Sequence, residues 1–254
     1  MDASNKNSLS TLIELSHEIG REDRPLAILG EGNTSMKLSE GQFAVKASGC
    51  CLGTLTDADI AICDSARILK MIDQKSWSDA AIDEALFASR IDGKGKKPST
   101  EAVFHAWLLT LEGVNFVGHC HSVPANQLLC SPRARDFAER RLFPDEVVCC
   151  GPASVFVPYV DPGLVLAREI RKQTESFVAK HKWTPRLIVL QNHGIIALGA
   201  TPNAVLACLL MATKAATIFV GAAAMGGPNF MSPQHVERIF VRPDEAHRQR
   251  ELKI

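Results

Sequence analysis

The chain has 254 residues, of which 46% are hydrophobic and 22% are charged, a composition typical of a globular protein. Its 28 lysines and arginines balance its 28 aspartates and glutamates, so no net charge favours nucleic acid or an anionic membrane surface. The polar first ten residues lack the apolar core of a signal peptide, and the longest apolar stretch, residues 204–225, contains Lys214 and suits a buried helix. These features predict a cytoplasmic protein that binds neither nucleic acid nor a membrane.

Hydrophobic spacing and turn residues predict alternating helices and strands along the chain. In chain order we expect a helix over 8–20, two strands within 33–48, helices over 78–90 and 99–113, strands over 115–122, 146–150 and 154–160, a helix over 163–181, two strands within 186–199 and a long helix after Thr201. Interleaved strands and helices indicate layered α/β architecture, and the paired strands favour antiparallel pairing. We therefore predict a three-layer α/β/α fold with a mainly antiparallel central sheet covered by helices.

Two histidines one residue apart, His119 and His121, follow an apolar run in the sequence VGHCHS. Residues i and i+2 of a strand face the same side, so both imidazoles can reach one metal ion, while Cys120 points to the opposite side. His193 lies at the end of another strand, in LQNHG, and could supply a third ligand. Taken separately, the His119–His121 pair and His193 are each more simply explained as ordinary hydrogen-bonded or turn residues, and it is the three together that match a metal site.

The segment KPSTEAVFHAWLL places Glu101 in the first turn of a helix that Ser99 or Thr100 would cap. Glu101 is either a carboxylate that complements the helix dipole or a general acid/base near a metal. His105, one turn further on, could be a fourth ligand, but packing or hydrogen bonding within the helix is the favoured interpretation.

Three short segments contain residue types that bind anions. GEGNTSMKL contains Asn33, VKASG contains Lys46, Ser48 and Gly49, and KPST contains Ser99 and Thr100. Hydroxyls, backbone N–H groups and a helix start that converge can hold a phosphate, although each segment alone is weak evidence.

Together, GEGNTSMKL, KASG, KPSTEAVFHAWLL, GHCHS and LQNHG resemble the class II aldolase/adducin family in order and approximate spacing, from about residue 9 to 220. The resemblance implies an α/β/α fold and a cyclic homotetramer with active sites between subunits. It implies zinc bound by His119, His121 and His193, with Glu101 as resting-state ligand and acid/base. It also implies a phosphate pocket formed by Asn33, Ser48, Gly49, Ser99 and Thr100.

The reaction implied is a reversible aldol cleavage of a ketose phosphate to dihydroxyacetone phosphate and an aldehyde, through an enediolate that zinc stabilises. Two departures leave alternatives open. The family's sugar-phosphate aldolases use a tyrosine from a neighbouring subunit, and the only tyrosine here, Tyr159, does not clearly match it. Lys46 stands where the fuculose-phosphate enzyme has neutral residues, and it could hold a phosphate, hold a carboxylate or simply be solvated.

Other members of the family carry out different reactions at the same metal. A decarboxylase of a hydroxylated aromatic or sugar-derived acid is the main alternative, followed by a sugar-phosphate epimerase and a non-catalytic adducin-like scaffold. Manganese or cobalt could replace zinc, because imidazole binds several metals. We expect a single domain over residues 1–254, with a tail at 241–254 that is a solvated helix or closes over a neighbour's site.

Overall fold

One seven-stranded sheet forms the centre of the molecule, with strand order β3-β2-β1-β4-β7-β6-β5. The computed structural model describes residues 3–74, 77–91, 95–252 and 254. The strands are β1 (Asn33–Ser39), β2 (Gln42–Lys46), β3 (Ile60–Asp64), β4 (Phe116–Cys120), β5 (Val155–Val157), β6 (Leu187–Leu190) and β7 (Gly194–Gly199). All neighbouring strands are antiparallel except β5 and β6, which are parallel. The sheet is therefore mixed, and the predicted mainly antiparallel α/β/α fold is confirmed.

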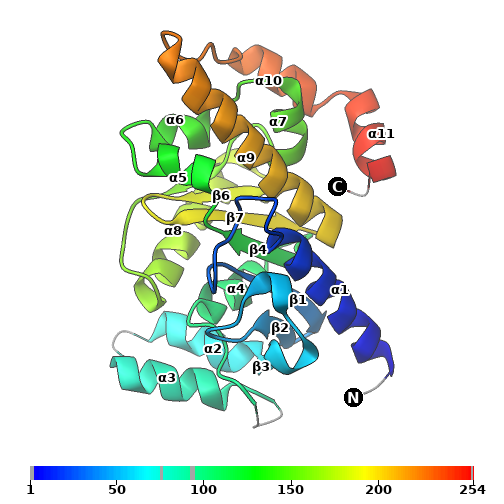
Figure 1. The fold of residues 1–254 in the computed structure, drawn as a ribbon, viewed down its shortest axis with the longest axis vertical. Helices are drawn as coiled ribbons and strands as arrows, with labels where there is room; N and C mark the ends of the chain where they lie inside the picture. The colour runs from blue at the N-terminus through cyan, green and yellow to red at the C-terminus, as the bar shows by residue number, and fades with distance from the viewer. Residues whose placement is uncertain (1–2, 75–76, 92–94, 253) are drawn as a thin grey trace.

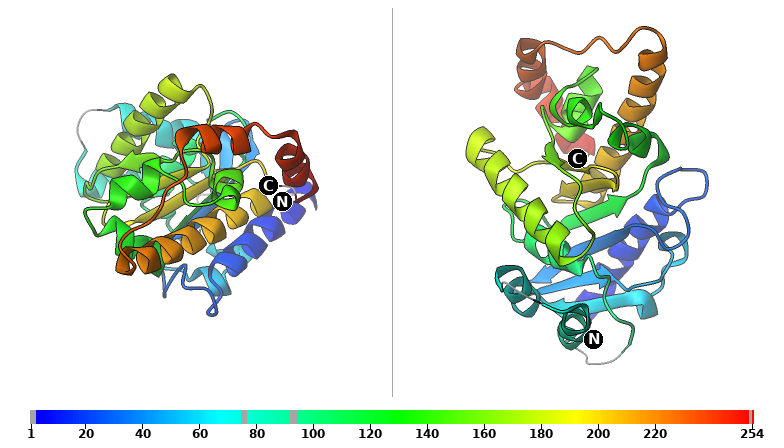
Figure 2. Two further views of the ribbon diagram at one scale, coloured as in Figure 1. Left: turned by 90° about the horizontal axis from the view of Figure 1, so that it is seen from above. Right: turned by 90° about the vertical axis from the view of Figure 1, so that its left-hand side faces the viewer.

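Helices cover both faces of this sheet (Figures 1 and 2). They are α1 (Ala3–Ile19), α2 (Ser65–Asp73), α3 (Asp79–Ala88), α4 (Ala102–Leu108), α5 (Val123–Leu129), α6 (Ala134–Glu139), α7 (Pro144–Cys150), α8 (Leu164–His181), α9 (Pro202–Ala224), α10 (Pro233–Phe240) and α11 (Pro243–Leu252), with short 3-10 helices η1 (Leu52–Thr54) and η2 (Asp57–Asp59). One apolar core contains residues of α2, α4 and α8, and another contains residues of α1, α5, α7 and α9. Because strand side chains alternate, Leu187 and Val189 of β6 enter the second core, and Ile188 and Leu190 enter the first.

The same alternation places polar residues of β1 on two different helices. Thr34 hydrogen-bonds Ser16 of α1, with 2.6 Å between their hydroxyl oxygens. Ser35, on the opposite face, lies 2.6 Å from Nδ1 of His105 in α4. Asn33 shares the face of Ser35 and lies opposite His119 in the pairing of β1 with β4. The first residue of β1 is therefore brought beside the first histidine of the site.

Helix α9 is the long helix expected after Thr201, whose hydroxyl accepts the Ala204 N–H and caps it. Among the described residues it is the one helix that is long and apolar enough to cross a membrane. This alone is weak evidence for a membrane span, because core helices of other proteins pass the same test. Its inner side packs on β4 and β7, and 39% of its most apolar 18-residue window is buried.

Two local expectations from the sequence are wrong. Residues 146–150 form part of α7 rather than a strand, because Pro144 starts a helix with Asp145 and Glu146 in its first turn. Helix α4 has Glu101 at its N-cap position, and neither Ser99 nor Thr100 caps it directly. The Ser99 hydroxyl instead accepts the backbone N–H of Glu101 at 3.3 Å, so it stabilises the turn that precedes the helix.

Within the C-terminal tail, helix α11 begins at Pro243 and contacts α7 through polar groups. Arg248 forms a 2.6 Å ion pair with Asp145, and the amide of Gln249 donates to the Val148 carbonyl at 3.2 Å. No residue of α11 in its described part is buried.

Candidate metal centre and anion pocket

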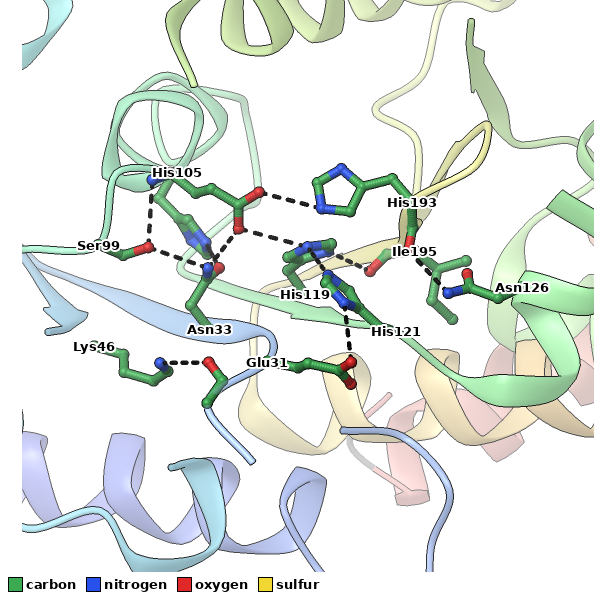
Figure 3. A network of polar contacts seen from close by, with 12 residues as sticks. Glu31, Asn33, Lys46, Ser99, His105, His119, His121, Asn126, His193 and Ile195 are labelled. Atoms are coloured by element: carbon green, nitrogen blue, oxygen red, sulfur yellow. Dashed lines mark hydrogen bonds and ion pairs between the residues drawn. The ribbon is translucent and has the colours of Figure 1, made fainter. Parts of the chain in front are cut away.

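Three histidines meet at the edge where two neighbouring strands end or begin: His119 lies in β4, His121 follows it, and His193 precedes β7 (Figure 3). One potential ligand atom from each of His119, His121 and His193 lies within 4.8 Å of the other two. The ring centroids are separated by 4.9, 5.0 and 4.9 Å, so the imidazoles form a nearly equilateral triangle. The Nε2 atoms of His119 and His121 are 3.1 Å apart. This arrangement can place three nitrogen ligands around a single cation.

Backbone groups fix the orientation of the rings. His119 Nδ1 lies 3.0 Å from the carbonyl oxygen of Ile195, which can only accept, so Nδ1 carries the proton and Nε2 offers a lone pair. Just beyond β4, the His121 N–H donates to the Leu26 carbonyl at 2.9 Å. His193 follows Asn192, whose φ of 56° is a conformation that asparagine adopts readily. The His193 backbone carbonyl accepts a hydrogen bond from the Asn126 side-chain amide at 3.0 Å.

A glycine permits the three rings to approach so closely. A Cβ placed on Gly194 would lie 2.5 Å from the Cys120 carbonyl oxygen, 2.9 Å from His121 Cδ2 and 3.1 Å from His119 Cε1. Any larger residue at this position would displace the strand or the rings, so Gly194 shapes the site although it has no side chain.

Burial keeps the three imidazoles uncharged. It lowers the pKa of His119 to about 3 and that of His121 to about 4, and neighbouring imidazoles add to both effects. The pKa of His193 is also lowered by burial, against an opposing attraction from Glu101. Neutral imidazole is the form that binds metal, so near neutral pH no proton has to be displaced.

Glu101 lies against the histidine triangle from the side of α4. Its Oε2 is 3.5 Å from His119 Nε2, and its Oε1 is 3.4 Å from His193 Nε2. The Asn33 amide donates to Oε2 at 2.6 Å and also to the Ser99 hydroxyl at 3.3 Å. The carboxylate is thus held with one oxygen toward each of two histidines, where it can ligate a cation or exchange a proton.

His105 does not join the triangle; it packs within its own helix against the Phe104 ring, as expected, but its side-chain hydrogen bonds go to another element. Its Nε2 bonds the Asn33 amide oxygen, and its Nδ1 faces the Ser35 hydroxyl across the gap to β1. The ring is fully buried, and burial lowers its pKa well below the ordinary value, so it is neutral. It therefore supports Asn33, a role that the helical spacing of the sequence did not suggest.

The residues predicted to bind an anion lie mostly on two adjacent segments beside this site. Ser48 N–H donates to the Lys97 carbonyl at 2.9 Å, and Ser99 N–H donates to the Lys46 carbonyl at 3.1 Å. These bonds pair the two segments antiparallel at Ala47 and Pro98, so that Ser48 lies opposite Lys97 and Ser99 lies opposite Lys46. Ser48, Gly49 and Thr100 are exposed. Gly49 has φ of 75°, a conformation that glycine adopts without strain.

Lys46 is 2% exposed, which removes the interpretation of a solvated strand lysine. Its ammonium donates to the Gly30 carbonyl at 3.2 Å. Burial lowers its pKa, while the neighbouring cysteines and Glu101 oppose the shift. A buried ammonium that donates to one carbonyl retains further N–H donors for an anionic ligand.

Tyr159 lies outside this cluster in the described part of the chain. Its hydroxyl is 3.3 Å from Asp161, its backbone N–H donates to the Gln191 side chain, and the residue is 54% exposed. By contrast, Glu31, which sequence patterns did not single out, places Oε1 3.8 Å from His121 Nδ1. Only its position between Gly30 and Gly32, in the anion-binding segment, could have drawn attention to it.

Comparison with known proteins agrees with this geometry. The sequence profile described as Class II Aldolase and Adducin N-terminal domain matches residues 11–220. The chain belongs to this family. It is 29% identical over 198 residues to an uncharacterized oxidoreductase, YuxG, from Bacillus subtilis (strain 168), covering 75% of this chain and 26% of that relative. The chain thus spans about a quarter of that protein's length.

Solved structures share the fold of this family member. The N-terminal class II aldolase domain of a conserved protein from Thermoplasma acidophilum has a TM-score of 0.66 and 25% identity, over 83% of this chain and 92% of that one. An L-fuculose 1-phosphate aldolase has a TM-score of 0.69 and 19% identity, over 94% and 96%. YgbL from Escherichia coli, called a putative aldolase/epimerase/decarboxylase, has a TM-score of 0.68 and 18% identity, over 94% and 100%.

Proposed function

We propose that this family member is a zinc-dependent carbon–carbon lyase that cleaves a ketose phosphate reversibly to dihydroxyacetone phosphate and an aldehyde. The observation that carries this function is the convergence of His119, His121, His193 and Glu101, which come from separate segments of the chain. Family membership and the likeness to an L-fuculose 1-phosphate aldolase support the same reaction class.

The residues present fit a divalent cation well. Burial keeps the three imidazoles neutral, and the bond from His119 Nδ1 to Ile195 directs its Nε2 toward the other rings. Zinc suits three imidazoles with one open position, and manganese or cobalt also accept this ligand set. When bound, such a cation supplies a Lewis acid that polarises a carbonyl group and stabilises the negative charge developing on its oxygen.

Glu101 moves the proton in this reaction. Its Oε1 and Oε2 face the point where the imidazoles meet, so a substrate carbon held there lies within reach of the carboxylate. The Asn33 amide, by donating to Oε2, fixes the direction in which the carboxylate presents its lone pairs. Its distances of 3.5 Å to His119 Nε2 and 3.4 Å to His193 Nε2 also suit the role of a resting-state ligand.

The anionic end of the substrate binds beside Lys46. The buried ammonium provides the charge, and the exposed Ser48, Gly49 and Thr100 provide hydroxyl and backbone donors. Asn33 and Ser99 connect this pocket to Glu101 through their shared hydrogen bond. A phosphate held there would place the neighbouring carbons of a small sugar near the three histidines.

Decarboxylation of a hydroxylated aromatic or sugar-derived acid is the second candidate, because the buried Lys46 ammonium can pair with a carboxylate as well as with a phosphate. The proton-donor role of Tyr159 stays a prediction that requires its delivery to a neighbouring subunit's site.

A parallel substrate screen tests both candidates. The purified protein is stripped of metal, reloaded with zinc, manganese or cobalt, and incubated with ketose phosphates and hydroxy acids. Release of an aldehyde supports the first candidate, and release of carbon dioxide supports the second. Failure to bind any of these metals would refute both and favour a non-catalytic scaffold.

We also propose that residues 1–254 act as one domain, in the cytoplasm, as a homotetramer with active sites at subunit interfaces. Apolar side chains exposed on α5, on α9 and at the C-terminal end of α9 support self-association, since Val123, Ile218 and Met225 are 45%, 41% and 88% exposed. Sedimentation equilibrium would report the number of subunits directly.

A further inference from the structure

A second cluster of polar side chains lies outside the histidine triangle, where Cys50, Asp59 and Lys96 meet. The Lys96 ammonium is 3.5 Å from Cys50 Sγ and 2.6 Å from Asp59 Oδ1. The Cys50 thiol donates to the same Oδ1 atom at 3.3 Å. One carboxylate oxygen therefore holds an amine and a thiol against each other.

The cluster is buried at one end and open at the other. Cys50 is 9% exposed, whereas the Lys96 side chain is 55% exposed and the Asp59 side chain 14%. Small oxidants can reach such an edge, while a bulky thiol such as glutathione cannot easily reach the sulfur. Intramolecular reaction with the adjacent amine is then favoured over exchange with another thiol, because the two groups are already in contact.

We propose that Cys50 and Lys96 form a covalent cross-link through one oxygen atom, a nitrogen–oxygen–sulfur bridge, with dioxygen as oxidant and oxygen source. The lysine ammonium, the cysteine thiol and one dioxygen molecule give the bridge, one water molecule and one released proton. The N–O and S–O bonds form, the O–O bond breaks, nitrogen loses two protons and sulfur loses one. Dioxygen is reduced, and the nitrogen–sulfur pair is oxidised. Asp59 Oδ1 contacts both groups that must lose protons.

The bridge would join the two segments that form the candidate anion pocket. Cys50 follows Ser48 and Gly49, and Lys96 precedes Ser99 by three residues. These segments are otherwise connected by hydrogen bonds, such as that from Ser48 N–H to the Lys97 carbonyl. A covalent bond would fix their separation and so alter anion binding. This consequence rests on the proposed function, whereas the bridge itself does not.

Mass spectrometry of the full chain tests the bridge without reference to catalysis. Protein purified under reductant is compared with protein kept in aerated buffer. We expect a species that gains one oxygen and loses two hydrogens, that reverts on treatment with a thiol reductant, and that joins the peptides of Cys50 and Lys96. Loss of tryptic cleavage after Lys96 should accompany it.

Conservative variants and their neighbours identify the partners. Cys50→Ser and Lys96→Arg should abolish the species, and Lys96→Arg retains the positive charge that pairs with Asp59. Cys51→Ser and Lys97→Arg should leave it unchanged, because Cys51 is exposed and Lys97 pairs with Asp83 instead. Gain of oxygen alone, loss of hydrogens alone, a bridge to Cys51, or an unmodified aerated protein would each overturn the assignment.

An inorganic phosphate titration separates this result from the proposed function. If the bridge forms and the affinity for phosphate changes at least severalfold on reduction, both ideas are supported. If it forms without any change in phosphate affinity, the cross-link stands and its influence on the anion pocket is refuted.

Discussion

Gly194→Ala tests whether the close approach of the three histidines depends on a missing side chain. The added methyl group would lie 2.5 Å from the Cys120 carbonyl oxygen and 2.9 Å from His121 Cδ2. Both distances are well inside carbon contact distance, which is about 3.5 Å or more. The carbonyl belongs to the paired strand β4, so the strand pair or the His121 ring has to move.

The size of the effect follows from these overlaps. Forcing a methyl group into a packed position costs about 1 to 3 kcal/mol of stability, and each kcal/mol lowers the Tm of a chain of this size by roughly 2 to 4 °C. A displaced ligand should cost more in metal binding, where changes that misorient a ligand typically lower affinity by about ten- to a hundredfold. We expect a modest fall in Tm and a large fall in zinc affinity.

Chelator competition measures the zinc affinity, and thermal unfolding of metal-free protein measures stability. Gly221→Ala in α9 is the matched control, because a Cβ there would meet nothing within 4 Å and alanine favours a helix. If Gly194→Ala and Gly221→Ala bind zinc equally tightly, whether both keep the normal affinity or both lose it, the close approach of the histidines does not depend on Gly194.

Three further predictions concern single groups of the site. Glu101→Gln should retain most bound metal and slow turnover about a hundredfold or more, as steady-state kinetics and metal analysis would report; unchanged turnover would exclude proton transfer by Glu101. Lys46→Met should raise KM for anionic substrates about tenfold or more and leave metal content unchanged, because a charge-assisted hydrogen bond contributes about 1.5 to 3 kcal/mol. An unchanged KM would mean that the anionic group of the substrate does not bind at Lys46. In metal-free protein, His119 and His121 have pKa values of about 3 and about 4 against 6.5 unfolded, so the unfolded chain binds more protons below pH 6.5. The free energy of unfolding, measured by chemical denaturation, should therefore fall as pH drops from about 6.5 to 4, and it should fall less steeply in His121→Ala. The same dependence on pH in both proteins would contradict this prediction.

Much of the fold could be predicted from the sequence because its patterns are local. Short segments rich in apolar residues and bounded by turn residues predicted β1, β2, β6 and β7, while Gly20 marked the end of α1 and Thr201 the start of α9. The strand predicted at residues 146–150 was wrong because the apolar run VVCC suits a buried strand as well as a buried helix. Pro144 and the two acidic residues after it, which start α7, were the overlooked signal.

Local spacing suggested that His119, in β4, and His121, just beyond it, could reach one metal ion. Their meeting with His193 depends on the pairing of β4 with β7, and only the resemblance of separate motifs to a family related the three histidines to one another. The contacts of His105 and Glu31 cross between elements that no local pattern relates. Such contacts depend on tertiary packing, so the sequence alone leaves them open.

The buried contacts of His105 give a last prediction, because they have a direction. Asn33 donates its amide hydrogen to Glu101 and therefore turns its oxygen toward His105, whose Nε2 must donate. Nδ1 then accepts from the Ser35 hydroxyl, so one proton arrangement satisfies the whole chain of groups. His105→Phe would leave the Asn33 oxygen without its donor, at about 1 to 3 kcal/mol.

That loss allows the Asn33 amide to rotate and turn its oxygen toward the Glu101 carboxylate. If the whole loss falls on the transition state, kcat drops roughly five- to a hundredfold, while metal content stays the same, because His105 lies outside the histidine triangle. His105→Gln carries an amide donor of similar reach and should restore part of kcat. If the phenylalanine variant keeps full kcat, or if both variants lose kcat equally, His105 does not orient Asn33 toward Glu101.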